Sequence, residues 1–381
     1  MRITVFTDYR YVRRDDGIWT ERAFALFLNE TARHHELTIV GREGAEGQVS
    51  PRYRLADGIA FAGMPYYESL ARPGTALRTL PAALRAFGRA SAHADVAWIL
   101  GPNPIALGFV LAARARRLPV VLGVRSDLPA YVASRYPGRR PFIAAANAME
   151  TAWRSLARRL PCVVVGPQLA ETYRASRRLH MLTVSLVREC DVTAGPAAAS
   201  ASGRELLSVG RLDSEKDPLL LLDVLARLRS TDARWSARIC GEGTLRGALE
   251  ERVRELGLGE AVRFEGYVQF GETILDLYRH SDALVVTSRS EGVPQTIVEA
   301  LASGLPVVST DVGGIRATFG DSVALVAPGD AEAIAACLLR LERDPGERQR
   351  MADAGRDVVR GHTLEAESAR LGAFFEAAAR R

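Results

Sequence analysis

Short apolar runs rich in β-branched residues alternate with longer amphipathic stretches from one end of the chain to the other. Runs that are apolar at every position predict buried parallel strands, and helical periodicity between them predicts the connecting helices. Two such series predict an α/β protein with two doubly wound domains. The predicted strands are Ile3–Thr7, Leu37–Gly41, Val96–Leu100, Val120–Val124, Cys162–Val165, Leu182–Leu186, Leu206–Val209, Ala237–Cys240, Val262–Phe264, Ala283–Thr287, Pro306–Thr310 and Val323–Val326, and helices are predicted over Trp19–Arg33 and Pro104–Arg116.

A stretch of small residues without periodicity, Gly195–Gly203, separates the two series. Such a composition is typical of a linker. We therefore expect a Rossmann-like N-terminal domain over residues 1–190, a linker over 191–204 and a Rossmann-like C-terminal domain over 205–360. The last residues, 361–381, have a helical pattern.

The composition is that of a globular protein, because 48% of the 381 residues are apolar and 25% are charged. The apolar run at the N-terminus is too short for a signal peptide. No run approaches the roughly 20 apolar residues that cross a bilayer. The four cysteines are scattered without the spacing of a disulfide framework. These features predict a cytoplasmic protein with reduced thiols.

Charge is distributed unevenly along the chain. Residues 1–190 carry 27 arginines and 15 acidic residues, whereas residues 191–381 carry 23 basic and 30 acidic residues. The basic half has no interleaved aromatic residues and no DNA-binding motif, so nucleic acid is not an expected partner. An anionic acceptor and the anionic inner face of a membrane, contacted peripherally, suit this half equally well.

Lys216 is the only lysine among the 50 basic residues of the chain. It stands in the stretch SVGRLDSEKDP, between a predicted strand and a helix that opens at Pro218. Arg211 lies in the same loop, directly after Gly210. Such loops lie at the carboxyl edge of a parallel sheet, where ligands bind, and two cations near a helix start favour a diphosphate. The alternative is an ordinary surface lysine.

Two glutamates, Glu291 and Glu299, lie eight residues apart in the stretch SEGVPQTIVEALASGLPVV. A helical rise of 1.5 Å per residue would separate them by about 12 Å. This is too far for the paired carboxylates of a glycosidase, which lie roughly 5–9.5 Å apart. The spacing favours two hydroxyl contacts at opposite ends of an extended ligand. The alternative is a helix cap or a salt bridge.

Between the two glutamates, the chain predicts the start of a helix with free backbone amides. The positive end of a helix dipole and its unpaired N–H groups bind phosphate. The amides are those of Gly292, Val293 and Gln295, and Pro294 is expected in the first helical turn. All four are predicted donor-binding residues.

The sequences GRLDSEK and EGVPQTIVEALASGLPVVSTDVGG, with ICGEGTLRGALEERVRELGLGEAVRFEGYV between them, resemble the donor-binding half of the retaining glycosyltransferases of family four. The resemblance covers Leu206 to about Asp330 and implies the GT-B fold, in which two Rossmann-like domains face each other across a cleft. It also implies that the final helix packs back on the N-terminal domain.

The resemblance implies a role for each matching residue. Arg211 and Lys216 would hold the donor diphosphate, Glu291 the hydroxyls of the transferred sugar, and Glu299 the ribose. The nucleotide base would lie near Tyr267 and Val268. Arg211, Lys216 and Glu291 would be the residues that carry catalysis.

The first half departs from the family pattern. Members have a glycine-rich loop after the first strand, but here only Gly17 precedes the first predicted helix, so Gly17 is a candidate acceptor-side residue. Many members also have a histidine after the fourth major strand, where this chain has Arg125, Ser126 and Asp127. Asp127 is the favoured acceptor contact, with Arg125 beside it, and the alternative is that Asp127 caps a turn before Pro129.

These observations predict a retaining hexosyltransferase that moves a sugar from a nucleoside-diphosphate sugar, UDP favoured over GDP, to a glycan, lipid-linked or small-molecule acceptor. The six histidines show no metal-ligand spacing and no D-x-D box occurs, so neither a metal nor a cofactor is expected. A non-catalytic nucleotide-sugar-binding subunit and a sugar-nucleotide epimerase are the alternatives. A dinucleotide-dependent oxidoreductase is disfavoured, because no GxGxxG follows the first strand of either domain.

Overall fold

The computed structural model describes residues 1–70, 74–136, 138–193 and 204–380, which form two compact units. Unit 1 comprises Met1–Thr183 and the chain from Glu367 onward, and unit 2 comprises Val184–Ala366. Unit 2 begins before the expected linker because Val187 is buried in its core. The linker stretch Gly195–Gly203 lies outside the described residues.

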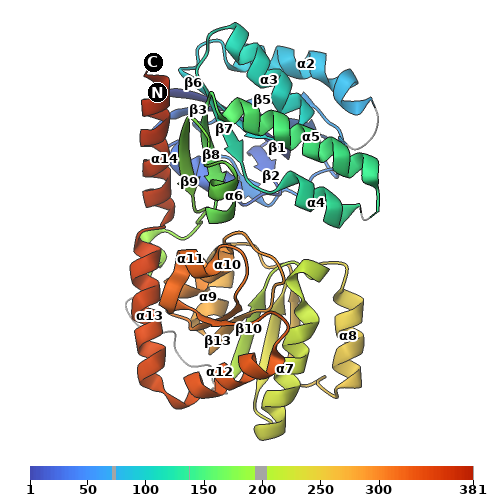
Figure 1. Cartoon of the computed structure of the whole chain (residues 1–381), viewed down its shortest axis with the longest axis vertical. Coiled ribbons are helices and arrows are strands. Elements are labelled where there is room, and N and C mark those ends of the chain that lie inside the picture. The colour runs from blue at the N-terminus through green and yellow to red at the C-terminus, as the bar shows by residue number, and fades with distance from the viewer. Residues whose placement is uncertain (71–73, 137, 194–203, 381) are drawn as a thin grey trace. The chain divides into compact units, whose positions relative to one another are not determined.

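Unit 1 contains a sheet whose parallel strands follow the order β5-β3-β1-β6-β7-β8-β9, with helices on both faces (Figure 1). The large buried side chains between sheet and helices include Phe6, Phe109 and Trp153. The strands are β1 (Arg2–Arg14), β3 (Glu36–Gly44), β5 (Ala60–Pro65), β6 (Val96–Gly101), β7 (Val120–Val124), β8 (Pro161–Val165) and β9 (Arg178–Leu182), and the helices are α1 (Phe24–Thr31), α2 (Thr75–Ala90), α3 (Pro104–Ala115), α4 (Leu128–Arg135), α5 (Arg140–Ala157) and α6 (Pro167–Thr172).

The last helix, α14 (Leu364–Ala379), begins in unit 2 and continues in unit 1. Within unit 1, Phe375 is fully buried and its ring lies 5.3 Å from the ring of Trp98. The guanidinium of Arg178, on β9, donates a hydrogen bond to the carbonyl of Ala377. The end of the chain is therefore part of the core of unit 1.

Two predictions for the first half were wrong. The helix expected from Trp19 begins only at Phe24, because β1 extends to Arg14 and pairs with an antiparallel strand, β2 (Gly17–Thr20), which in turn pairs with β4 (Tyr53–Arg54). Tyr11 in the extension is fully buried, so this segment contributes to the sheet core. The strand expected over Leu182–Leu186 lies earlier in the chain, because β9 ends at Leu182.

Unit 2 contains a parallel sheet of order β12-β11-β10-β13-β14-β15, also covered by helices on both faces (Figure 1). Its strands are β10 (Glu205–Val209), β11 (Ser236–Cys240), β12 (Val262–Gly266), β13 (Ala283–Val286), β14 (Val307–Thr310) and β15 (Ala324–Val326). Its helices are α7 (Pro218–Thr231), α8 (Arg246–Glu255), α9 (Glu272–Arg279), α10 (Gln295–Ala302), α11 (Ile315–Phe319), α12 (Ala331–Arg343) and α13 (Pro345–Arg360).

Both sheets reverse their strand order beside their first strand. In unit 2 the chain runs from β10 outward to β11 and β12, then returns to β13 and runs the other way. In unit 1 the corresponding reversal lies between β1 and β6. The connecting loops diverge at such a switch point and leave a crevice at the carboxyl ends of the strands. Each unit therefore has one place where its topology favours ligand binding.

Candidate functional site

The loops after β10 and β13 meet at the switch point of unit 2. The ammonium Nζ of Lys216 lies 2.5 Å from Oε1 of Glu291, and the hydroxyl of Ser288 donates to the same oxygen at 2.6 Å. The side chains of Lys216 and Glu291 are only 25% and 9% exposed. No described residue donates a hydrogen bond to Oε2 of Glu291. The pair therefore fixes the lysine and leaves one carboxylate oxygen for a ligand.

Further contacts hold these two loops together. The hydroxyl of Thr287 donates to the carbonyl of Lys216 at 2.9 Å, and the backbone amide of Arg289 donates to the carbonyl of Glu215 at 2.8 Å. Asp217 has the left-handed φ of 46° and its carboxylate accepts a 2.8 Å hydrogen bond from Arg289 instead of capping α7. Contacts between the loop after β10 and the loop after β13 thus set the position of Lys216.

Arg211, the second predicted cation, is exposed and paired with acids of its own loop. Its guanidinium lies 2.7 Å from Asp213 and also pairs with Glu215, while 65% of its side chain is exposed. The backbone amide and hydroxyl of Thr244 donate to Asp213, and these bonds, with Arg211, hold the pKa of Asp213 below its usual value. Exposed ion pairs contribute only about 0–1 kcal/mol. Arg211 is therefore free to turn toward an incoming anion.

The predicted phosphate site lies at the start of α10. The helix begins at Gln295, with Pro294 as the preceding cap residue. No described residue accepts a hydrogen bond from the backbone amides of Gly292 and Val293. Because residues 291–294 are not helical, the 12 Å separation expected between the two glutamates rested on a wrong assumption. The extended segment instead leaves donors available beside the Lys216–Glu291 pair.

Glu299 lies on α10 with its side chain toward the core. The residue is 7% exposed, and its Oε2 accepts a 2.8 Å hydrogen bond from the hydroxyl of Tyr278 on α9. Burial raises the pKa of Glu299 to about 7, although the bond from Tyr278 acts in the opposite direction. Burial therefore favours the neutral form of this carboxyl relative to that of an exposed glutamate.

Three glycines bring the backbone of neighbouring loops into contact, and sequence reasoning did not assign them to the site. A Cβ on Gly241 would lie 1.8 Å from the carbonyl oxygen of Gly210, and one on Gly243 would lie 2.4 Å from that of Leu212. A Cβ on Gly313 would lie 1.8 Å from the carbonyl oxygen of Glu291. The G-E-G and V-G-G patterns were the available signals, since glycine permits such close approach.

The residues expected near a nucleotide base follow β12 directly. Tyr267 is 43% exposed, whereas Val268 packs partly buried against the core of unit 2. Their strand lies two places from the switch point, beyond β11. The base contact stays a prediction.

The acceptor-side residues predicted in unit 1 are not brought together. Gly17 opens β2, with a φ of 134°, and its neighbour in space is the side chain of Arg54. Asp127 accepts a 2.9 Å hydrogen bond from the amide of Ala130 and so caps α4. Of the three predicted residues, only Arg125 lines the pocket at the switch point of unit 1. Its neighbour Ser126 lines the pocket as well.

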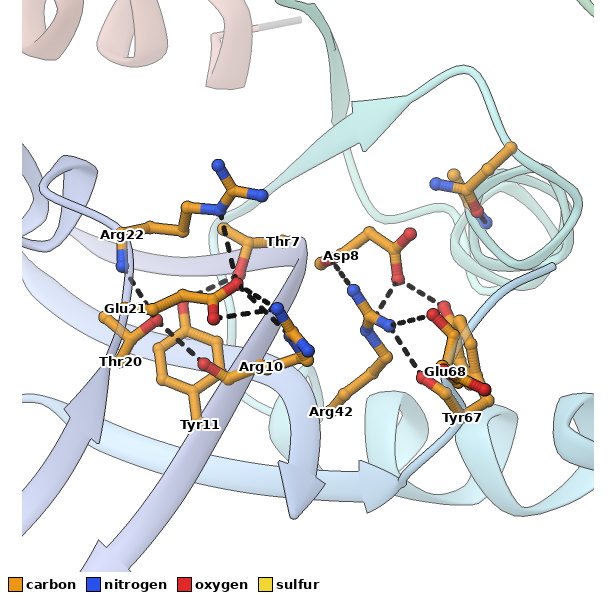
Figure 2. A network of polar contacts seen from close by, with 12 residues as sticks. Thr7, Asp8, Arg10, Tyr11, Thr20, Glu21, Arg22, Arg42, Tyr67 and Glu68 are labelled. Atoms are coloured by element: carbon orange, nitrogen blue, oxygen red, sulfur yellow. Dashed lines mark hydrogen bonds and ion pairs between the residues drawn. The ribbon is translucent and has the colours of Figure 1, made fainter. Parts of the chain in front are cut away.

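A buried network that sequence reasoning missed also lies at this switch point (Figure 2). Asp8 follows the first part of β1, and its carboxylate lies 3.2 Å from the guanidinium of Arg42 and accepts a hydrogen bond from the hydroxyl of Tyr67. The same guanidinium donates to the carbonyls of Asp8 and Tyr67 at 2.6 and 2.7 Å. Burial outweighs Arg42 and raises the pKa of Asp8. These partners are 34 and 59 residues away in the chain.

Among the described residues, no cluster of three or more histidine, cysteine, aspartate or glutamate side chains has the arrangement to hold a metal ion. In the same part of the chain, no helix has the length and apolar character needed to span a bilayer.

Residues 197–358 match the family Glycosyl transferases group 1. This match lies within unit 2 and does not extend into the first 196 residues. The glycogen synthase of Mycobacterium tuberculosis (strain CDC 1551 / Oshkosh) is 35% identical over 154 residues, which are 40% of this chain and 37% of that protein. The chain thus aligns with well under half of this curated relative.

Solved structures extend the similarity to the whole chain. Sucrose-phosphate synthase from Thermosynechococcus elongatus superposes with a TM-score of 0.70 over 99% of this chain and 98% of its own, at 17% identity. Anabaena Alr3699/HepE, in complex with UDP and glucose, gives a TM-score of 0.72 over 99% of this chain and 100% of its own, at 16% identity. The group 1 domain is therefore the second part of a GT-B fold.

Proposed function

We propose that the chain is a retaining glycosyltransferase that moves a sugar from a nucleoside-diphosphate sugar to an acceptor hydroxyl without a metal ion. The observation that carries the proposal is the ion pair of Lys216 and Glu291 at the switch point of the group 1 domain. It places a fixed cation beside unpaired backbone amides. The UDP bound to the similar HepE structure favours UDP over GDP in this chain.

The reaction needs positive charge where the nucleoside diphosphate leaves. As the bond between the sugar C1 and the phosphate oxygen breaks, negative charge grows on the diphosphate. Lys216, the amides of Gly292 and Val293, and Arg211 would stabilise this charge. Preorganised donors of this kind usually lower the reaction barrier more than any other feature of an active site, and together they would replace the divalent ion that other transferases use.

The carboxylates suit the hydroxyls of the donor. Oε2 of Glu291 would accept a hydrogen bond from the transferred sugar, while its Oε1 holds Lys216. Glu299 would accept from the ribose when ionised. A new bond then forms between C1 and the acceptor oxygen on the face that the phosphate leaves. The departing phosphate oxygen takes the proton of the acceptor hydroxyl, so retention requires no protein base.

Replacement of Lys216 by Ala tests the proposal. We expect donor turnover to fall at least a hundredfold, because loss of one preorganised charge contact costs roughly 2.7–4 kcal/mol of barrier. Thermal shift with UDP and GDP measures nucleotide binding, since a ligand that binds only the folded state stabilises it. Lys216→Arg should restore part of the shift, and Arg254→Ala, on exposed α8, serves as the charge-matched control.

Hydrolysis of the donor without acceptor distinguishes the enzyme from its alternatives. If UDP-glucose is hydrolysed to UDP and the first glucose anomer formed is α, the configuration of the donor has been retained. This result supports a retaining transferase. Tight binding without turnover would instead indicate a nucleotide-sugar-binding subunit, and conversion to another UDP-sugar would indicate an epimerase. Full activity in Lys216→Ala, or dependence on a divalent ion after EDTA treatment, contradicts the proposed charge stabilisation.

A further inference from the structure

Unit 1 contains a pocket of about 460 Å³ at its own switch point. The pocket is formed by Asp8 and Tyr9 within β1, by the segments after β6 and β7, and by helices α4 and α5. Its volume is within the range of small-molecule sites, roughly 300–1,000 Å³. The apolar and aromatic side chains that line it include Leu70, Leu128, Tyr131, Val132, Phe142 and Met149.

Asp8 and Arg125 are the charged residues among those lining the pocket. The charge of Asp8 is compensated, because Arg42 lies 3.2 Å from its carboxylate and Tyr67 donates to it. Figure 2 shows the other carboxylate oxygen of Asp8 pointing away from Arg42. The net charge that this pocket presents is therefore that of Arg125.

Arg125 forms no ion pair with any described residue. Its guanidinium lies over the ring of Phe24, 4.0 Å from the centroid, and 5.6 Å from that of Tyr9. Burial alone lowers the pKa of Arg125 to about 10, which still leaves it charged at neutral pH. A partly buried guanidinium without an anion is costly, and a carboxylate or phosphate would offset that cost through paired hydrogen bonds.

We propose that this pocket binds the sugar acceptor, and that the acceptor is a small molecule with an apolar, ring-containing body and one anionic group paired with Arg125. The apolar lining selects the body and Arg125 selects the anion. The free oxygen of Asp8 can accept a hydrogen bond from a hydroxyl of the acceptor. The inference rests on the proposed function, because it takes a sugar acceptor to be needed. A neutral glucan would leave both the apolar lining and the cation unmatched.

Two fluorescent probes with nearly the same ring system test the pocket in the full chain. One is 1-anilinonaphthalene-8-sulfonate, which carries an anion, and the other is the uncharged N-phenyl-1-naphthylamine. We expect Arg125→Gln to weaken binding of the sulfonate at least tenfold and of the neutral probe less than twofold. Arg125→Lys keeps the charge and should stay within threefold of the wild type for both. Arg85→Gln, at an exposed position on α2, is the control.

Ala145→Trp, at an exposed position on the pocket wall, should weaken both probes by filling the space. Equal loss of both probes in Arg125→Gln, or loss of neither, overturns the proposal.

The acceptor role is tested with 4′-hydroxybiphenyl-4-carboxylate and its carboxamide. The acid should displace the sulfonate probe at a tenfold lower concentration and be glycosylated in preference. Equal use of acid and amide overturns the acceptor class.

Nucleotide binding, measured in the same preparations, separates the two proposals. If UDP or GDP stabilises the wild type but not Lys216→Ala, and the probes show no charge selectivity, the acceptor class is wrong and the proposed function stands. If the probes are charge-selective but no nucleotide binds, the proposed function fails and the acceptor role fails with it.

Discussion

The two units have switch points of the same topology, but different types of side chain line them. In unit 2 the crevice has charged pairs, in which Glu291 fixes Lys216 and the exposed Arg211 pairs loosely with Asp213. In unit 1 the crevice is apolar, its carboxylate Asp8 is neutralised by Arg42, and Arg125 has no anion. One parallel-sheet topology thus supplies a polar, preorganised site and an apolar pocket with a single cation.

The difference shows which part of each site is set by the backbone. Both crevices follow from the reversal of strand order, whereas the ligand class follows from the side chains on the loops. In unit 2 the glycines also let the backbones of neighbouring loops approach each other closely. The chemistry of a site therefore has to be argued from its residues, unit by unit.

The first prediction tests this comparison at the backbone of unit 2. It is expected to change the free energy of unfolding more than the others. Gly241→Ala would force a Cβ to 1.8 Å from the carbonyl oxygen of Gly210, at a φ of 147°. We expect a loss of about 3 kcal/mol in the free energy of unfolding and loss of the thermal shift by UDP. Amide hydrogen exchange of β10 measures the first effect.

Gly247→Ala is the matched control for this substitution. A Cβ there meets no atom within 4 Å, and the residue lies in α8. Helix propensity predicts a gain of roughly 0.5–1 kcal/mol instead of a loss. If Gly241→Ala were as stable as this control, the close approach of the two loops would not be needed for the site.

The strand pattern and the local motifs allowed most of unit 2 to be predicted from sequence. Strands such as β13 and β15 are apolar at every position, so they could be recognised as buried parallel strands. Lys216 was expected at the carboxyl edge because its loop follows a predicted strand, and Glu291 likewise comes shortly after the predicted strand Ala283–Thr287. Their direct contact was not, because it depends on the pairing of β10 with β13, strands that are far apart in the chain.

The β1–β2 hairpin and the pocket of unit 1 were not predicted, for physical reasons. The hairpin is completed by strands that lie further along the chain, because β1 pairs with β3 and β2 pairs with β4. The pocket combines Asp8, Asn103, Arg125 and Met149, which lie on four different segments. No local motif marks such a site. The single signal was that the residues after β7 departed from the family pattern.

The second prediction concerns the buried carboxyl of unit 2. Because folding raises the pKa of Glu299 from the ordinary 4.5 to about 7, the native state binds more protons than the unfolded state between these values. The free energy of unfolding must therefore fall as pH rises through this range. A shift of this size predicts a loss of about 2 kcal/mol between pH 5 and 7.

Glu299→Gln removes this proton equilibrium and keeps the hydrogen bond from Tyr278. The difference in stability between wild type and variant, measured by urea unfolding at each pH, should favour the wild type more at pH 5 than at pH 7. A constant difference across this range would mean that Glu299 is ionised throughout. An ionised Glu299 would add a permanent negative charge to unit 2. The charges described at the switch point of unit 2 would then have to include that of Glu299.

The smallest expected effect separates Asp127 from its neighbour Arg125. Asp127 accepts a hydrogen bond from the amide of Ala130 at the start of α4, so Asp127→Ala should cost about 1 kcal/mol of stability. Asp127→Asn preserves the cap and should unfold at the urea concentration of the wild type. If the carboxylate acts only as a cap, this variant also retains sugar transfer. If instead Asp127→Asn is stable but at least tenfold slower, Asp127 contacts the acceptor, and the apolar pocket would not be the whole of the acceptor site.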